Sequence, residues 1–370
     1  MHPWPELHPE LLAPVPEREE LRQVVREVLA KHADHEQVRA AADSAAGYSE
    51  DLWRLLNVEL EISRLAVAEN LGGNGFGLQE LFVVIEECGA GLLPEPVLSS
   101  AALGCQALAA ADDPASITDL LTPALSGELV VTVATGADPL TAAQDPDGRW
   151  RVSGGRARVL HGAAAGLVVV DAVTPQGAVL FAVAATDVAV RPRTTVDLTR
   201  RQADLSFDAA PARLLVGVPR AAAVIDRLDL IGRAALAAEH TGIVGELLDR
   251  TCEYVTQRDQ FGRAVGSFQA IKHRLADVLV DRERARSASR YAAAVLDGEP
   301  DTAALPVAVA AAACADAAMR TAHEAVQLHG GIGFTWEHRA HYYVRRVLGD
   351  EGLFGASREH RARIAELVEV

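Results

Sequence analysis

Two short stretches in the last third of the sequence carry residues that could bind a phosphate-bearing ligand. Arg258 lies near the end of a predicted helix, just before the turn at Gly262, and a fixed arginine supplies strong charge-assisted donors to phosphate. Gln327 precedes Gly330 and Gly331 at the end of another predicted helix. A glutamine can donate and accept hydrogen bonds, and glycines let backbone amides approach a ligand closely. Singly, an exposed arginine and a helix C-cap would explain these residues; together they predict a binding site.

A metal centre is the other site chemistry that the residue types suggest. His338 and His341 are three residues apart on a predicted helix, with Glu337 beside them, which could place two ligands on one face. No third ligand is evident, so the sequence predicts no metal site. It also has no phosphate-binding P-loop, no Gly-x-Ser-x-Gly motif and no dinucleotide fingerprint after a strand. The charged run from Lys272 to Arg290 indicates a solvated, salt-bridged helix face.

The composition argues against several kinds of partner. The chain has 370 residues and a net charge of −16, so repulsion from phosphate argues against nucleic acid. Its four cysteines are scattered and form no Cys-x-x-Cys pair, which indicates buried free thiols in a reducing cytosol. We see no signal peptide, and the apolar stretch Ala303–Ala318 is too short and too weakly apolar to span a bilayer. We therefore expect a cytoplasmic protein without a membrane segment.

The periodicity of apolar residues predicts helices, then strands, then helices. The first helices are expected at Glu17–His32, Leu78–Cys88 and Ser99–Ala111. Short strands separated by turn residues are expected at Leu129–Val133, Trp150–Val152, Arg158–Leu160, Leu167–Val170, Ala178–Val183 and Leu205–Phe207. Long helices of an antiparallel bundle are expected at Ala221–Gln257, Ser267–Leu296, Ala303–His329 and Glu337–Leu348. We expect an α+β fold with a helical domain at 1–125, a β-sandwich or barrel at 126–216 and a C-terminal four-helix bundle at 217–370.

This plan and several motifs resemble the acyl-CoA dehydrogenase family over nearly the whole chain. The glycine-rich stretch Val67–Gly77 and the segment Leu93-Pro-Glu-Pro96 are similar to the family's first domain. Arg258-Asp-Gln-Phe-Gly262 is like the family's Arg-x-x-Phe-Gly, and Ser267-Phe-Gln-Ala-Ile271 follows at the expected distance. Gln327-Leu-His-Gly-Gly331 resembles the family's Gln-x-x-Gly-Gly. Three such motifs at matching spacing in one helical domain make the resemblance specific.

The resemblance implies a flavin cofactor and an oligomer. In the family, residues at these positions reach the adenine and pyrophosphate half of an FAD whose ring lies in the neighbouring subunit. The residues implied for this role are Arg258, Gln260, Phe261, Gln269, Gln327, Gly330 and Gly331. The resemblance also implies a dimer of dimers. It places Arg233 near the CoA-bearing substrate, with a plain helix-surface arginine as the alternative.

The sequence departs from the family at the catalytic base. The family's reaction needs a carboxylate to remove the α-proton of the thioester while the flavin takes a hydride from the β-carbon. The family carries this glutamate at one of two positions, which are occupied in this sequence by Phe354 and Gly232. Neither residue can accept a proton, so we expect no catalytic residue at either position. Three carboxylates lie close in sequence to these positions: Glu351, Asp350 and Glu239. Any of them could be a relocated base, but we favour the interpretation that they are solvated charges at helix ends.

A second departure concerns the residues that hold the flavin ring in the family. The stretch Val131–Asp138 lacks the family's Thr-Glu-Pro segment and the Gly-Ser-Asp that follows it. Val159 stands in place of a tryptophan, and His161 stands in place of a hydroxyl residue. A ring pocket built from these residues would be poor. His161 could be a new acid or base, although a lone histidine is more often structural or exposed.

Both departures affect the flavin ring and the base, while the residues for the other half of the dinucleotide remain. We therefore interpret the chain as the base-lacking subunit of a heteromeric acyl-CoA dehydrogenase. A second, catalytic subunit would complete a heterotetramer with two copies of each chain.

The stretch Gly331–His338, followed by Tyr342-Tyr343, looks like the actinobacterial subgroup that degrades steroids. The resemblance implies an acyl-CoA substrate and an electron-transfer flavoprotein as acceptor. Two alternatives stay open: a stand-alone enzyme of this fold with a relocated acid or base, and a non-catalytic protein that binds acyl-CoA or a partner.

Overall fold

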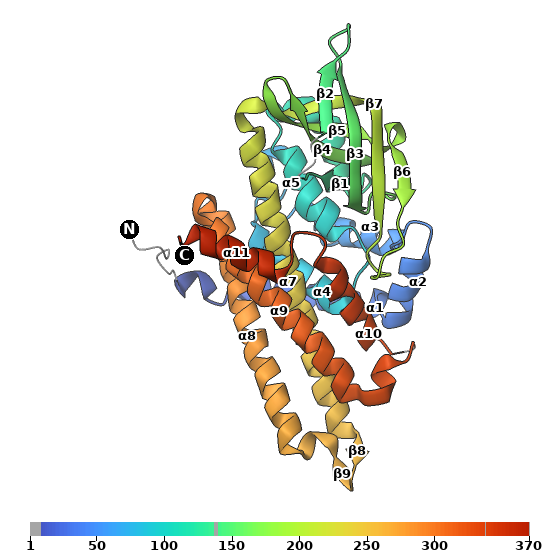
Figure 1. Ribbon diagram of the computed structural model, residues 1–370, viewed down its shortest axis with the longest axis vertical. Helices are drawn as coiled ribbons and strands as arrows, with labels where there is room; N and C mark the ends of the chain where they lie inside the picture. Colours follow the sequence, from blue (N-terminus) through green and yellow to red (C-terminus); the bar gives the residue numbers. More distant parts are fainter. Residues whose placement is uncertain (1–8, 137–139, 337, 370) are drawn as a thin grey trace.

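The computed structural model describes residues 9–136, 140–336 and 338–369. Its long axis runs from a β domain at one end to the tip of a helical bundle at the other, and the N-terminal helices lie across the middle (Figure 1). The fold class predicted from the sequence is confirmed, because helices, a sheet and a helical bundle follow one another along the chain.

The N-terminal helices are α1 (Pro16–His32), α2 (His35–Asp43), α3 (Glu50–Val58), α4 (Leu78–Gly91), α5 (Cys105–Ala109) and α6 (Thr118–Leu125), with single 3-10 turns between them. Among them, α1 packs against α4, and α4 also packs against two helices of the C-terminal bundle. The helix expected at 99–111 differs, because the chain first forms a wide π-helix, η3 (Val97–Gly104). Its small residues let it approach the first strand: a Cβ at Gly104 would lie 2.6 Å from Cβ of Val131.

The strands of the described residues form one main sheet that closes on itself. They are β1 (Val131–Ala134), β2 (Leu140–Gln144), β3 (Trp150–Leu160), β4 (Leu167–Thr174), β5 (Gly177–Ala184), β6 (Ala189–Pro192) and β7 (Gln202–Val216). The pairing runs β1-β4-β2-β3-β7-β5, and β5 also pairs with β4, so five strands complete a barrel. The two strands expected within 150–160 are the ends of β3, which bulges against β7.

The C-terminal helices form the bundle. They are α7 (Val218–Gln257), α8 (Gln269–Gly298), α9 (Ala304–His329), α10 (Ala340–Asp350) and α11 (Ser357–Leu367). A hairpin of β8 (Asp259–Gln260) and β9 (Arg263–Ala264) joins α7 to α8 at the free tip of the bundle (Figure 1). The helix expected from residue 337 begins at Ala340, and Glu337 lies outside the described residues.

One segment is long and apolar enough to cross a membrane. Ala304–Phe334 passes that test by length and composition, which differs from the sequence expectation for this region. In this fold α9 packs against α7, α8, α10 and α11, and 56% of its most apolar window is buried. A buried core helix of a helical bundle explains the composition.

Two glycines let α4 and α7 cross closely. A Cβ at Gly242 would lie 1.8 Å from the carbonyl oxygen of Glu86, and a Cβ at Gly89 would lie 2.4 Å from that of Glu239. Neither position has room for a side chain. The crossing joins the N-terminal helices to the bundle and fixes Glu239 at their junction.

Candidate functional site

The segments that carry the residues expected to bind the cofactor are the β8–β9 hairpin and the adjoining ends of α7, α8 and α9, toward the free end of the bundle (Figure 1). Tyr254 ties the ends of α7 and α9, because its ring stacks on His329 at a centroid distance of 4.4 Å. Its hydroxyl donates to the carbonyl oxygen of His329 at 3.3 Å. This contact brings Arg258 and Gly330, which follow the two helix ends, to the same end of the molecule.

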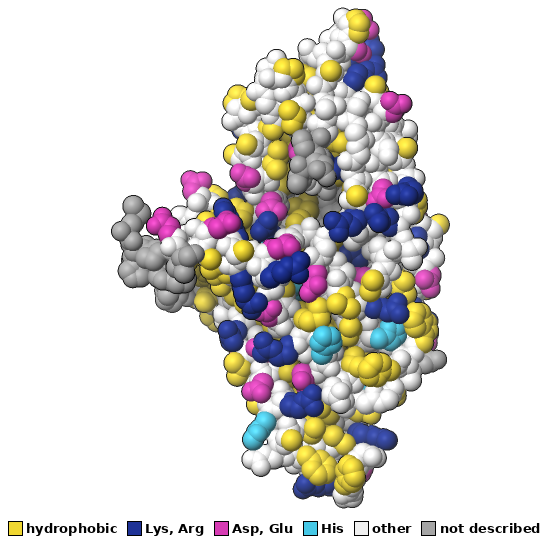
Figure 2. Space-filling view, viewed as in Figure 1, with side chains coloured by type: hydrophobic (Ala, Val, Ile, Leu, Met, Phe, Trp, Pro, Cys, Tyr) yellow, Lys and Arg dark blue, Asp and Glu magenta, His cyan; other side chains and the backbone are white. Residues whose placement is uncertain are grey.

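All of these residues are exposed: Arg258, Gln260, Phe261, Gln269, Gln327, Gly330 and Gly331. The guanidinium of Arg258 has no ion pair or hydrogen bond with any residue that the structure describes. Phe261 is 92% exposed and has φ +53, a conformation that non-glycine residues rarely adopt. Figure 2 shows hydrophobic side chains gathered over this hairpin, at the lower end of the view. An unpaired arginine beside an exposed aromatic ring indicates a surface that a ligand or partner covers.

The glycine pair leaves the backbone open at this tip. A Cβ at Gly330 or Gly331 would meet no atom of the described residues within 4 Å. Gly330 has φ +62, so the end of α9 itself favours glycine there. Gly331 has no such backbone requirement, and the packing of the chain gives no reason for a glycine at 331. The open backbone and the unpaired guanidinium of Arg258 therefore fit a phosphate-bearing cofactor.

The two positions where the family carries its base are in contact with each other. Gly232 lies on α7, and Phe354 follows α10 in the sequence. A Cβ at Gly232 would lie 2.4 Å from Cε1 of Phe354, so the aromatic ring packs directly over the glycine. The ring fills the space that a carboxylate side chain would need. The remaining cavity measures about 80 Å³. That volume is below the roughly 300 Å³ of a small ligand pocket.

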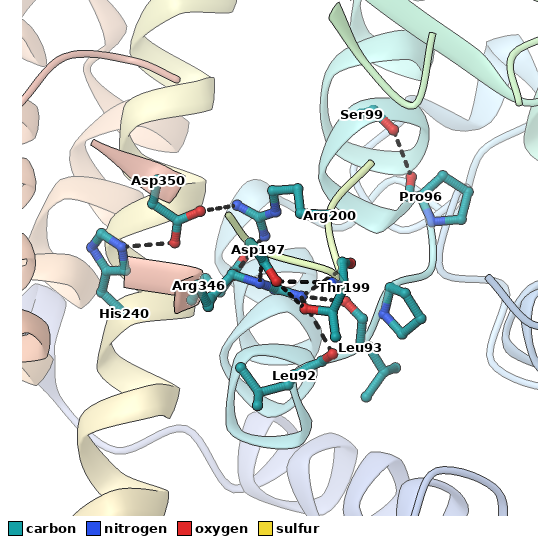
Figure 3. A network of polar contacts seen from close by, with 12 residues as sticks. Leu92, Leu93, Pro96, Ser99, Asp197, Thr199, Arg200, His240, Arg346 and Asp350 are labelled. Atoms are coloured by element: carbon teal, nitrogen blue, oxygen red, sulfur yellow. Dashed lines mark hydrogen bonds and ion pairs between the residues drawn. The ribbon is translucent and has the colours of Figure 1, made fainter. Parts of the chain in front are cut away.

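Glu239 and Asp350 belong to a buried ion network. Figure 3 shows Asp350 of this network with Arg200, Asp197 and Arg346. Arg346, from α10, is 1% exposed; its Nε donates to Oδ2 of Asp197 at 2.6 Å and its Nη1 donates to Oε1 of Glu239 at 2.7 Å. Arg200 precedes β7, and its Nη1 donates to Oδ1 of Asp350 while its Nη2 donates to Oε1 of Glu239, both at 2.6 Å. The network joins the β domain to the bundle.

The ion pairs argue against a role for either carboxylate as the catalytic base. Burial alone would raise the pKa of Glu239, but the two arginines hold it at about 2. Asp350 accepts from Arg200, and its Oδ2 lies 3.1 Å from Nε2 of His240. The expectation that Glu239 and Asp350 are solvated helix-end charges is wrong, because both are buried and ion-paired. Glu351 is exposed.

His161 is a buried structural residue. Its Nε2 donates to the carbonyl oxygen of Pro94 at 2.9 Å, so its Nδ1 is the acceptor for the hydroxyl of Ser99, also at 2.9 Å. Burial lowers the pKa of His161 to about 4, so the ring is neutral at pH 7. Both ring nitrogens are occupied, which argues against the acid or base role considered from the sequence.

The positions that match the family's flavin-ring contacts are closed. The side chain of Thr132 donates to the carbonyl oxygen of Leu160 at 2.6 Å, and Val159 is buried. The void beside His161 measures about 20 Å³, which is room for about one water molecule. The end of the matching segment, residues 137–139, lies outside the described residues. The void beside His161 is too small for a flavin ring.

Arg233, the residue expected near the substrate, lines the small cavity beside Phe354. Its Nε lies 2.8 Å from Oδ2 of Asp229, one turn earlier on α7, and the side chain is 26% exposed. A guanidinium has five N–H donors, so this ion pair leaves donors for a ligand. The substrate role stays a prediction.

The two histidines considered as metal ligands belong to an aromatic cluster. The ring of His341 stacks on Trp336 at 5.1 Å, and its Nε2 donates to the Trp336 carbonyl oxygen at 3.2 Å. His338 packs against His329 at 4.7 Å. Among the described residues, which leave out Glu337, no three His, Cys, Asp or Glu side chains are grouped for a metal ion.

Comparisons with known proteins match over most of the chain. Sequence profiles of the acyl-CoA dehydrogenase N-terminal and C-terminal domains match residues 15–128 and 223–368. The acyl-CoA dehydrogenase IpdE2 of Mycobacterium tuberculosis is 35% identical over 355 residues, covering 95% of this chain and 98% of that protein.

Two solved structures with high similarity come from complexes of two named chains. A chain of the ChsE4-ChsE5 complex from Mycobacterium tuberculosis has a TM-score of 0.88 and 30% identity, covering 96% of this chain and 98% of that one. A chain of a variant Tcur3481-Tcur3483 steroid ACAD has a TM-score of 0.86 and 31% identity, covering 95% and 98%.

Proposed function

The chain belongs to the acyl-CoA dehydrogenase family, and we propose that it is the subunit of a heteromeric member that lacks the catalytic base. Members of the family are flavoproteins that oxidise CH–CH bonds, so the activity class and the cofactor, FAD, are those predicted from the sequence. A bound FAD would supply the acceptor for the hydride that leaves the β-carbon of the acyl-CoA. In the proposed assembly, a catalytic partner removes the α-proton.

The proposal rests on one observation: within this chain, the half of the flavin site at the bundle tip is open, and the half near the β domain is filled. At the bundle tip, Arg258 is unpaired and the backbone at Gly331 is open. Near the β domain, the ring positions are filled, with a void of about 20 Å³. The base positions are occupied by Phe354 packed on Gly232. This difference supports a role in which the chain closes the flavin site of another chain.

In the assembled site, this chain would bind the adenine and pyrophosphate half of the cofactor. Arg258 offers a full positive charge to the phosphates, and the glycine backbone offers amides. The exposed ring of Phe261 would lose its contact with water. The full proposed set is Arg258, Gln260, Phe261, Gln269, Gln327, Gly330 and Gly331, with Arg233 toward the substrate.

The proposed partner is a second acyl-CoA dehydrogenase-like chain, in a heterotetramer with two copies of each. Support comes from similarity to a chain of the ChsE4-ChsE5 complex and to a chain of the Tcur3481-Tcur3483 steroid ACAD. The similarity to the Tcur3481-Tcur3483 steroid ACAD also supports a bulky, steroid-like acyl-CoA as the substrate class. We also propose that an electron-transfer flavoprotein accepts the electrons and that the protein is located in the cytoplasm.

The test is to purify this chain alone and after coexpression with a sister chain that retains the glutamate. We expect flavin absorbance and acyl-CoA desaturation only in the coexpressed complex. Arg258→Ala should reduce flavin retention by the complex, whereas Arg263→Ala serves as the matched control, because Arg263 already lies 4.0 Å above the Phe268 ring. A yellow, active homo-oligomer of this chain alone would overturn the proposal.

The alternatives have less support. A stand-alone enzyme with a relocated base would need a free carboxylate. Of the three considered from the sequence, Glu239 and Asp350 are held by Arg200, which leaves the exposed Glu351. A non-catalytic acyl-CoA-binding protein could use the same arginine and glycine backbone for the phosphates of CoA, so the flavin content of the complex distinguishes this alternative from the proposal. That protein would show no flavin in any complex, which the coexpression experiment measures.

A further inference from the structure

A small apolar cavity lies between the start of α1, the helix α4 and the helix α8. It shares no residue with the proposed cofactor site or with the cavity beside Phe354. Most of its wall is apolar, and the buried part comprises Phe82, Val83, Ala238 and Ala293. The cavity measures about 210 Å³. Since a cavity of roughly 150 Å³ is enough to bind benzene, this one has room for a small apolar body.

A larger and more polar cleft adjoins this cavity. It measures about 750 Å³, and mostly charged side chains of α1, α4, α7 and α8 line it. Four residues line both spaces and mark their border: Glu19, Arg22, Glu86 and Arg290. An apolar ligand in the small cavity would therefore have charged groups of the protein at one end.

Arg290 is the arginine at this border that no carboxylate holds. Arg22 donates from Nη2 to Oε2 of Glu86 at 2.8 Å. The carboxylate oxygen nearest to Arg290 is the same Oε2, at 3.9 Å, which is too long for a hydrogen bond. Arg290 has no hydrogen bond with any residue that the structure describes. Its side chain is 44% exposed, so its N–H donors are accessible to a ligand.

The charges around the cavity favour an anion over a cation. Its wall carries three arginines and two glutamates: Arg18, Arg22, Arg290, Glu19 and Glu86. Burial lowers the pKa of Arg290, and the carboxylate of Glu86 opposes this shift. The positive charges of Arg22 and Arg286 lower the pKa further. In a chain of net charge −16 this local excess of positive charge is unusual, and a bound anion would offset the repulsion between the arginines.

We propose that the small cavity binds an apolar monocarboxylate whose carboxylate group pairs with the guanidinium of Arg290. The hydrocarbon part of the ligand packs against side chains of α4 and α8, among them Phe82 and Ala293. A guanidinium and a carboxylate form charge-assisted hydrogen bonds, which are stronger than those between neutral groups. The proposal goes beyond the heteromeric function and depends on neither flavin nor a partner chain.

The test uses the purified full-length chain and three probes of equal chain length. Isothermal calorimetry at pH 7 would measure the binding of octanoate, octanamide and octylamine. We expect octanoate to bind about tenfold more tightly than octanamide, because only octanoate carries a negative charge to Arg290. Octylamine, which is a cation at this pH, should bind most weakly. Equal affinities for octanoate and octanamide, or tighter binding of octylamine, would overturn the proposal.

Two methionine variants on α8 assign the effect to Arg290. Arg290→Met should reduce the affinity for octanoate to about that for octanamide and leave the melting temperature unchanged, because Arg290 has no hydrogen bond to lose. Arg284→Met is the matched control: it removes the same charge from the same helix, its side chain is 73% exposed and it lines neither space. If the two variants bound octanoate equally well, the carboxylate would not lie at Arg290.

A chain-length series tests the apolar half of the site. From butanoate through hexanoate to octanoate, each additional CH₂ that enters the cavity should tighten binding about fourfold. Ala293→Leu fills part of the cavity and should remove most of this dependence, and a thermal melt shows whether the variant is folded. Affinity that does not rise with chain length in the wild type, or a full dependence in folded Ala293→Leu, would contradict binding in this cavity.

Discussion

Replacing Arg346 with methionine should destabilise this chain far more than the same change at Arg345. Arg346 donates to Asp197 and Glu239 and also to the side chain of Thr199 at 2.6 Å. Its loss leaves two buried carboxylates short of their counter-ion, which costs about 3–5 kcal/mol. Arg345 lies 4.9 Å above the ring of Trp336, and losing such a cation–π contact costs about 0.5–1 kcal/mol.

The pH dependence of the same network has a definite sign. The pKa of Glu239 is held at about 2 in the folded chain, against an ordinary value of 4.5. Because the folded pKa is depressed, the stabilisation is present above about pH 4.5 and is lost as the pH falls toward 2.

Chemical denaturation followed by circular dichroism measures both effects. The free energy of unfolding of the wild type should fall between about pH 4.5 and pH 2, and Arg346→Met should show a smaller fall. At pH 7 the ordering should be wild type, then Arg345→Met, then Arg346→Met. If Arg346→Met were no less stable than Arg345→Met, the buried ion pairs would not be present in solution and the reasoning would fail.

Three further predictions concern the other parts of the site. Gly232→Ala should lower the free energy of unfolding by about 1–3 kcal/mol, because the new Cβ meets the ring of Phe354. A double-mutant cycle with Phe354→Ala, measured by denaturation, should show coupling between the two positions. Additive effects would contradict the contact. Arg258→Ala should leave the melting temperature unchanged and weaken FAD binding by the coexpressed complex about tenfold or more. Flavin retention after dialysis measures the binding, and unchanged retention would count against the phosphate role. Ser99→Ala should cost about 1–3 kcal/mol of stability by leaving a nitrogen of His161 unpaired, with the folded complex still active; a folded, inactive complex would point to chemistry at His161.

The elements with clear periodicity could be predicted closely from the sequence. The first helix was expected at Glu17–His32 and spans Pro16–His32, since its apolar residues repeat at helical spacing. The π-helix at Val97–Gly104 could not be predicted, because its small residues permit several backbone forms. The contact of Gly104 with Val131 decides between them.

The candidate site could be predicted in part. Arg258 and Gly331 were recognised from their spacing in the sequence. Their shared place at the bundle tip follows from the contact between the ends of two helices, and a local sequence pattern does not specify that contact. The buried network was missed. A signal was present in α10, since Arg346 and Asp350 lie at helical spacing with Tyr343 on its buried face. Arg200 lies before β7, and no local pattern places it beside α10.

Counting flavin in the coexpressed complex by native mass spectrometry tests the central claim most directly. If one chain holds the ring and this chain closes only the other half, each pair of unlike chains forms a single complete site. We predict two FAD molecules per four chains, all lost when this chain is analysed alone. Four FAD molecules per tetramer, or stoichiometric FAD on this chain alone, would contradict the account.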